Sequence, residues 1–159
     1  MDRVSKENYY LDIAETVIER ATCLRRCYGA IIVKNDEIIS TGYNGAPRGR
    51  KNCVDLGCCT RESMNVPHGE RYELCRSVHA EANAIISAAR RDMAGGALYL
   101  AGKDAATGAI LYDAQSCAMC RRMIINAGLK NVVTRTGPGQ FRVVDVQEWV
   151  EEDDSLPEK

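Results

Sequence analysis

The sequence predicts an α/β fold with three layers, α/β/α, around a central mixed sheet of about five strands. Two observations predict it. Two neighbouring strand patterns near the N-terminus form a hairpin, and helical and strand patterns then alternate to the end of the chain. Such alternation places helices on both faces of one sheet. At 159 residues the chain suits a single core. We therefore expect one domain over residues 1–152 and an acidic, frayed tail over residues 153–159.

The first half of the chain contains a helix, a hairpin and a long loop. Residues 5–21 carry apolar side chains at helical spacing, and Ser5 is a suitable N-cap. Residues 30–33 and 38–43 are strand-like and flank a tight turn at Asn35-Asp36. Residues 48–76 are polar and rich in cysteine, without a sustained period. A loop of this length in a compact domain is expected to be functional or held by a ligand.

The second half alternates between helical and strand patterns. One helix is expected from His79 to about Arg91, and a second from Cys117 to a stop at Gly128, a typical C′ residue. The remaining expected elements are a strand at 97–101, a polar connection at 102–115, strands at 131–135 and 141–144 around a turn at 137–139, and a short terminal helix at 145–152.

Composition narrows the class of partner and the compartment. The net charge of −1 favours a small substrate over a nucleic-acid polymer, although Arg25-Arg26 and Arg121-Arg122 could each form a local basic pocket. The charged N-terminus and the absence of a long apolar run predict neither a secretion signal nor a membrane span. We expect a cytoplasmic protein. Eight cysteines are then metal ligands or free thiols rather than disulfides.

Two short motifs carry the chemistry: His79-Ala80-Glu81 and Cys117-Ala118-Met119-Cys120. One His and two Cys supply three zinc ligands and leave a fourth position for water, as in catalytic rather than structural zinc sites. Zinc lowers the pKa of such a water from about 15.7 to about 7, and Glu81 would then transfer protons. Each motif opens a helical pattern. Because residues two apart face opposite sides of a helix, His79 and Glu81 converge only if His79 occupies the very start of its helix.

The other cysteines suggest a second metal site within the long loop. They are Cys23, Cys27, Cys53, Cys58, Cys59 and Cys75, with His68 nearby. The loop has too few apolar residues to order itself, and a closed zinc site of four Cys, or three Cys and one His, would supply that order. The irregular spacing does not select the ligands, and ordinary buried thiols are the alternative.

At these residues the chain resembles the deoxycytidylate (dCMP) deaminase family of the cytidine deaminase-like superfamily. The resemblance runs from about Glu7 to Arg135. It includes Thr22–Arg26 with Gly29-Ala30, Gly42–Pro47, Cys75 with His79–Ala84, and Cys117–Gly128. The H-x-E and C-x-x-C pieces are common to zinc deaminases. The Gly-Tyr-Asn-Gly loop and the cysteines before His79 point to the dCMP branch.

The resemblance implies hydrolysis of dCMP to dUMP and ammonia, which supplies thymidylate synthesis. His79, Cys117 and Cys120 would bind the catalytic zinc, and Glu81 would be the proton shuttle. Asn44 would hold the sugar, although an Asn-Gly pair is also a common turn. A second, structural zinc would bind Cys23, Cys53, Cys58 and Cys75, with Cys59 and His68 as alternatives.

The resemblance also implies regulation and assembly. In regulated members a dCTP and dTTP site between subunits involves the loop that matches Gly42, Tyr43 and Gly45, and a position that matches Arg90. A homo-oligomer, a dimer or hexamer, is expected. For the substrate phosphate the first candidate is Arg26 and the second is Arg25.

One departure from the family pattern precedes the C-x-x-C motif, where Ser116 stands in place of Pro. Because Pro stiffens the entry to a helix and Ser does not, we expect a softer loop with its zinc ligands intact. Two other functions stay open at this point: another deaminase, acting on a nucleoside or on tRNA, and a zinc-stabilised nucleotide-binding module without catalysis.

Overall fold

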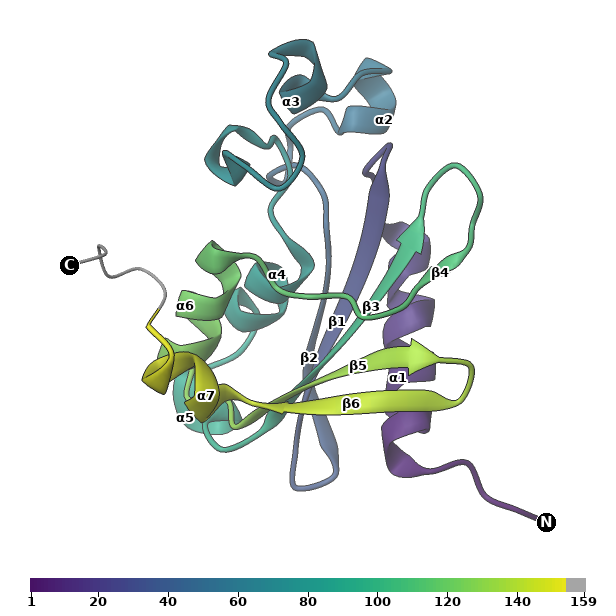
Figure 1. Cartoon of the computed structure of the whole chain (residues 1–159), viewed down its shortest axis with the longest axis vertical. Coiled ribbons are helices and arrows are strands. Elements are labelled where there is room, and N and C mark those ends of the chain that lie inside the picture. Colours follow the sequence, from purple (N-terminus) through teal and green to yellow (C-terminus); the bar gives the residue numbers. More distant parts are fainter. Residues whose placement is uncertain (154–159) are drawn as a thin grey trace.

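A mixed six-stranded sheet forms the centre of the computed structural model, which describes residues 1–153 (Figure 1). The strand order is β2-β1-β3-β5-β6, with the short β4 paired to β3. Only β3 and β5 are paired in parallel. The bounds are β1 Arg26–Lys34, β2 Glu37–Tyr43, β3 Ala97–Asp104, β4 Ile110–Leu111, β5 Asn131–Gly137 and β6 Gln140–Asp145. The predicted mixed sheet is confirmed, with one strand more than expected.

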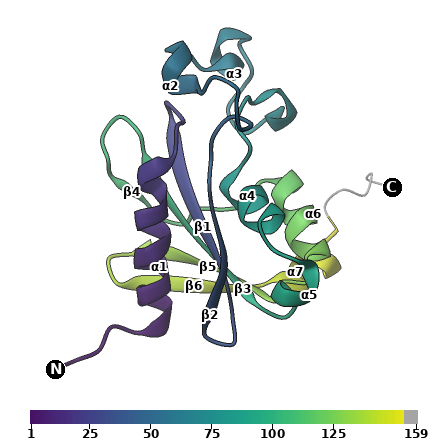
Figure 2. The same cartoon turned by 180° about the vertical axis from the view of Figure 1, so that it is seen from behind.

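Helices cover both faces of the sheet, as the alternating pattern predicted (Figure 2). On one face, α1 (Lys6–Val17) packs Leu11 and Ala14 against Ile31 of β1. On the other face lie α4 (Ala80–Ile86), α5 (Arg90–Met93), α6 (Ala118–Asn126) and α7 (Val146–Glu151). Because side chains alternate along a strand, Ile31 enters the first core and Ile32 the second. Strand β1 thus contributes side chains to the cores on both faces of the sheet.

Local sequence signals set several element boundaries. The Ser5 hydroxyl accepts a hydrogen bond from the Asn8 backbone N–H at 3.2 Å, which confirms the predicted N-cap. Asn35 and Asp36 have φ of 52° and 61°, as a tight hairpin turn requires. Gly128, with φ of 76°, directly follows the C-cap of α6. A 3-10 turn, η1 (Ile18–Arg20), continues α1 toward β1.

Two sequence expectations are wrong. The helix expected from His79 to about Arg91 ends at Ile86, and α5 begins separately at Arg90 after an irregular segment. The alanines continue at helical spacing across this break, so the sequence pattern does not reveal it. The polar connection expected at 102–115 is not fully irregular, because β3 continues to Asp104 and β4 pairs back onto it. Of the tail expected at 153–159, residues 154–159 lie outside the described part of the chain.

The long cysteine-rich loop projects from one end of the sheet (Figure 1). It contains α2 (Cys53–Leu56), α3 (Thr60–Ser63) and the 3-10 turn η2 (Tyr72–Leu74). Asn52 ties it to the body, since its side-chain oxygen accepts from the Thr22 hydroxyl at 3.0 Å and from the Ala46 N–H at 3.1 Å. Over residues 1–153, every helix is too short or too polar to cross a membrane.

Candidate active site

His79 is held at the very start of α4. It is the N-cap residue, with extended φ and ψ of −69° and 154°, so its side chain lies outside the helical spiral. The preceding Val78 pairs with Gly45 through two backbone hydrogen bonds of 2.7 and 3.2 Å. The Asn83 amide donates to the Tyr43 carbonyl at 2.8 Å. The expectation that His79 must stand at the start of its helix is confirmed.

Cys117 and Cys120 occupy the equivalent position on α6. Cys117 is the N-cap residue, and Cys120, which is buried, lies in the first turn. The loop before them is held by Arg121, whose Nε donates to the Ser116 carbonyl at 3.0 Å and whose Nη2 donates to the Gln115 side chain at 3.2 Å. These contacts tie the loop at Ser116 to α6.

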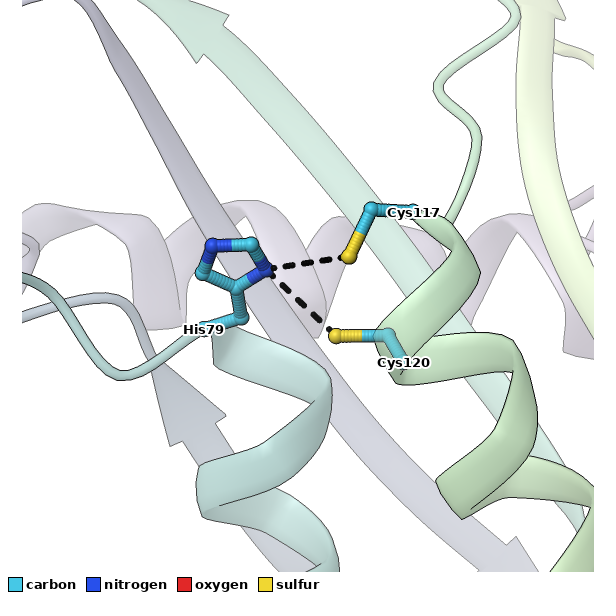
Figure 3. A group of neighbouring side chains, drawn as sticks. All are labelled: His79, Cys117 and Cys120. Atoms are coloured by element: carbon cyan, nitrogen blue, oxygen red, sulfur yellow. Dashed lines mark hydrogen bonds between the residues drawn. The ribbon is translucent and has the colours of Figure 1, made fainter. Parts of the chain in front are cut away.

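The three side chains converge on one point between the two helix N-termini (Figure 3). His79 Nδ1 lies 3.5 Å from Cys117 Sγ and 3.4 Å from Cys120 Sγ. In a zinc tetrahedron with Zn–S of roughly 2.3 Å and Zn–N of about 2.0–2.1 Å, nitrogen and sulfur are about 3.6 Å apart. The donor set therefore fits zinc in both type and spacing. Among the described residues, this is the one group of three such donors within 4.8 Å of one another.

The three candidate ligands shift one another's pKa values. A hydrogen bond to Cys117, followed by one to Cys75, raises the pKa of His79 to about 10. Hydrogen bonds from Cys120 and His79 lower the pKa of Cys117 to about 4. The hydrogen bond to Cys117, with burial, raises the pKa of Cys120. A zinc ion bound here would therefore displace protons from His79 and Cys120. Metal binding at such a site releases protons.

Glu81 lies beside the donor set and is 5% exposed. Burial raises the pKa of its carboxyl above the usual range. Its helix also explains its placement: Ala80 and Ala84 are fully buried against the sheet, and a side chain on Gly42 of β2 would lie 2.4 Å from the Ala80 carbonyl. This close approach of α4 to β2 brings Glu81 to the cavity.

One cavity joins these residues to the arginines predicted for phosphate binding. Glu81 and His79 line it together with Arg25, Arg26 and Asn44. Arg26 is exposed, whereas Arg25 forms an ion pair with Glu62 at 2.9 Å. Asn44 uses its side chain to brace β1, because it accepts from the Tyr28 N–H at 2.8 Å and donates to the Arg26 carbonyl at 2.9 Å. It still lines the cavity, as a sugar-binding residue must.

The residues predicted for an effector site do not line this cavity, and the structure gives several of them other contacts. Gly42 allows α4 to approach β2, and Gly45 pairs with Val78. Tyr43 is partly exposed and accepts a hydrogen bond from Asn83 through its carbonyl. Arg90 donates from Nε to the Asn126 carbonyl at 2.7 Å, at the end of α6.

The predicted structural-zinc cysteines are only partly brought together. Burial raises the pKa of Cys53, and the neighbouring thiols Cys23, Cys75 and Cys59 add to that rise. Cys58, by contrast, is exposed. Cys59, rather than the predicted Cys58, is therefore the neighbour of Cys53 in this part of the loop.

Sequence reasoning missed two cavity residues in the long loop, Arg61 and Tyr72. Tyr72 packs edge-on against the His79 ring, with the ring centroids 5.5 Å apart, and Arg61 stacks over Tyr72 with Cζ 4.4 Å from its centroid. An arginine in a polar segment is usually solvated. No periodic signal in the sequence distinguished this one.

The fold and donor set define a zinc-binding α/β protein with a catalytic type of metal site. Residues 4–136 match the family model described as the cytidine and deoxycytidylate deaminase zinc-binding region. The chain belongs to this family.

Two curated relatives and one solved structure show the closeness of the relationship. The deoxycytidylate deaminase of Schizosaccharomyces pombe is 33% identical over 135 residues, which are 84% of this chain and 38% of that protein. The deoxycytidylate deaminase of Mycobacterium phage D29 is 34% identical over 137 residues, 84% of this chain and 96% of that protein. A crystal structure of dCMP deaminase from the cyanophage S-TIM5 in complex with dCMP and dUMP has a TM-score of 0.55 and 26% identity, and covers 83% of this chain and 82% of that one.

Proposed function

We propose that the protein hydrolyses dCMP to dUMP and ammonia and so supplies thymidylate synthesis. The observation that carries the proposal is a single cavity lined by Glu81, by three arginines and by His79 and Cys117 of a zinc-type donor set, which Cys120 completes. The relatives named deoxycytidylate deaminase, and the cyanophage enzyme that binds dCMP and dUMP, support this substrate.

His79, Cys117 and Cys120 would hold the zinc, which supplies the Lewis acidity that makes water reactive near neutral pH. Glu81 then carries one proton of the attacking water to N3 of the cytosine, and afterwards carries the remaining proton of the C4 hydroxyl to the amino group, which leaves as ammonia. Its place at the start of α4, beside the donor set, suits a group that must reach both water and base. Asn44 would orient the sugar, and Arg26, with Arg25, would attract the phosphate.

The test is ammonia release by the zinc-replete protein from dCMP, deoxycytidine and CMP. Preference for dCMP supports the proposal. Preference for deoxycytidine would keep the chemistry and reject the substrate, and no release from any of the three would reject the proposed reaction.

A second, structural zinc is also proposed, with Cys59 replacing Cys58 in the ligand set Cys23, Cys53, Cys59 and Cys75. The exposure of Cys58 and the proximity of Cys59 to Cys53 support the change. Zinc content measured by mass spectrometry should fall by one ion per chain in Cys59→Ser and stay unchanged in Cys58→Ser. Loss of one zinc ion in Cys58→Ser, with none lost in Cys59→Ser, would instead support the predicted set with Cys58.

A cytoplasmic homo-oligomer, a dimer or hexamer, regulated by dCTP and dTTP, is proposed from the family resemblance. Gly42, Tyr43, Gly45 and Arg90 would form the effector site. Light scattering gives the subunit number, and assays with each triphosphate test the regulation. A monomer whose rate neither triphosphate changes would reject this part of the proposal.

A further inference from the structure

Arg61 of α3 is a buried arginine whose hydrogen bonds are incomplete. It is 5% exposed. Its Nη2 donates to the carbonyls of Pro67 at 3.1 Å and Glu70 at 2.5 Å, while its buried Nε has no partner among the described residues. Two neutral carbonyls do not balance a buried positive charge, because an ion taken out of water needs an opposite charge to offset the loss of hydration.

The other buried arginine of the described chain shows the contrast. Arg135, 9% exposed, is paired with the carboxylates of both Asp12 and Glu15 and also donates to Asn8 at 2.7 Å. Within residues 1–153, Arg61 pairs with no carboxylate. The fold therefore neutralises Arg135 by direct ion pairs, whereas Arg61 has only carbonyls, the Tyr72 ring and the field of Glu73, without an ion pair, to offset its charge.

The position of Arg61 connects that charge to the reaction centre. Arg61 lines the same cavity as His79 and Glu81. Its Cζ is 4.4 Å from the Tyr72 ring centroid, which is 5.5 Å from that of His79, so the guanidinium and the imidazole cannot be farther apart than these two distances combined. In a nucleotide whose base reacts beside His79, the sugar separates the phosphate from the base. The phosphate therefore lies away from the metal, at a distance comparable to that between His79 and the cavity wall at Arg61.

The charges of the cavity favour an anion at that wall. Its lining includes Arg25, Arg26 and Arg61, and Glu81 is its one carboxylate among the described residues. Arg25 is already paired with Glu62, and Arg26 is exposed to solvent, where screening weakens its attraction. A guanidinium presents a planar fork of donors suited to phosphate oxygens, and burial strengthens the contact.

We propose that Arg61 is the principal phosphate-binding residue of the cavity and that it selects nucleoside monophosphates over nucleosides. The role assumes the proposed deamination, with the phosphomonoester of the substrate as the anion that Arg61 binds.

The test compares kcat/KM for dCMP and for deoxycytidine in the wild type, Arg61→Gln, Arg61→Lys and the control Arg71→Gln. Arg71 lies in the same loop, is exposed and pairs with Glu73. For Arg61→Gln, the ratio of the two values should fall about 10- to 150-fold, as expected for one charge-assisted hydrogen bond. Arg61→Lys should recover part of the loss, because it keeps the charge and loses the fork, and Arg71→Gln should keep the wild-type ratio. Equal losses on both substrates would overturn the proposal and leave Arg61 a purely structural role in holding Pro67 and Glu70.

A binding measurement separates this proposal from the proposed reaction. Isothermal calorimetry with dUMP and deoxyuridine needs no catalysis. The wild type should bind dUMP more tightly than deoxyuridine, and Arg61→Gln should lose that difference while its deoxyuridine affinity stays near wild type. If the wild type releases no ammonia but shows this pattern, the proposed reaction fails and the phosphate site stands. An unchanged dUMP preference in Arg61→Gln would overturn the phosphate site whatever the activity.

Discussion

Gly45 and Val78 exchange two backbone hydrogen bonds, of 3.2 Å from the Gly45 N–H and 2.7 Å from the Val78 N–H. This small bridge joins the loop after β2 directly to the residue that precedes His79. Asn83 of α4 adds a side-chain hydrogen bond to the carbonyl of Tyr43, the last residue of β2. The position of His79 therefore depends on the end of β2 as much as on its own helix.

Gly42→Ala should destabilise the protein and displace α4. A Cβ at this position would lie 2.4 Å from both the Ala80 carbonyl and the Ala84 N–H nitrogen, which are backbone atoms that cannot rotate away. We expect a loss of about 3 kcal/mol, at the upper end for overpacking, together with weaker zinc retention. Urea unfolding measures the first and zinc content after dialysis the second.

Gly108→Ala is the control, since its Cβ would meet nothing within 4 Å and its cost comes only from its φ of 73°. Equal losses of stability in the two variants would show that the close contact between α4 and β2 is not the cause of the loss in Gly42→Ala.

Arg121→Ala should weaken zinc binding without unfolding the domain. The substitution removes the hydrogen bonds to Ser116 and Gln115 and the stacking of the guanidinium over Trp149, 5.0 Å from the ring centroid. Loss of a group that orients metal ligands typically costs about 10- to 100-fold in metal affinity. Competition with a chromophoric chelator measures the affinity. The neighbouring Arg122→Ala, at an exposed position, should match the wild type, and a normal affinity in Arg121→Ala would contradict the role.

The Tyr10–Asp36 hydrogen bond should make stability fall at high pH. The bond to Asp36, aided by burial, raises the pKa of Tyr10 from 10.0 to about 12. Because the folded state favours the neutral phenol, this contribution is complete below pH 10 and is lost as the pH rises through about 12.

The check is the difference in unfolding free energy between wild type and Asp36→Asn as a function of pH. It should be constant from neutral pH to pH 10 and shrink between pH 10 and 12. At acid pH it should also shrink, because the hydrogen bond to Tyr10 lowers the pKa of Asp36. The exposed Lys6–Asp36 ion pair, which the same substitution removes, should contribute little. A pH-independent difference across that window would reject the assignment.

The sequence predicted those features that depend on local pattern. The Ser5 cap, the Asn35-Asp36 turn and the stop at Gly128 each follow from a residue type with a strong conformational preference. The placement of His79 also followed from geometry alone, because its convergence with Glu81 is impossible inside a helix. The α/β/α layering followed from the order of such elements.

Features that depend on distant contacts were missed. The break after Ile86 leaves no mark in a run of good helix formers. Strand β4 has two residues and exists only because β3 lies beside it. Arg61 is buried by carbonyls of its own loop, and its stacking on Tyr72 cannot be read from spacing. The thiols near Cys53 likewise come from separate segments, so position in the sequence could not choose Cys59 over Cys58.

Glu81→Gln tests the central claim most directly. Glutamine keeps the size of the buried side chain and its capacity for hydrogen bonds but cannot carry the proton. The variant should fold, retain zinc and bind dCMP. Its rate of ammonia release from dCMP should fall by about 10²–10⁴-fold relative to wild type. Release at a rate close to wild type would contradict the account, because some other group would then move the proton in the cavity that His79, Cys117 and Cys120 define.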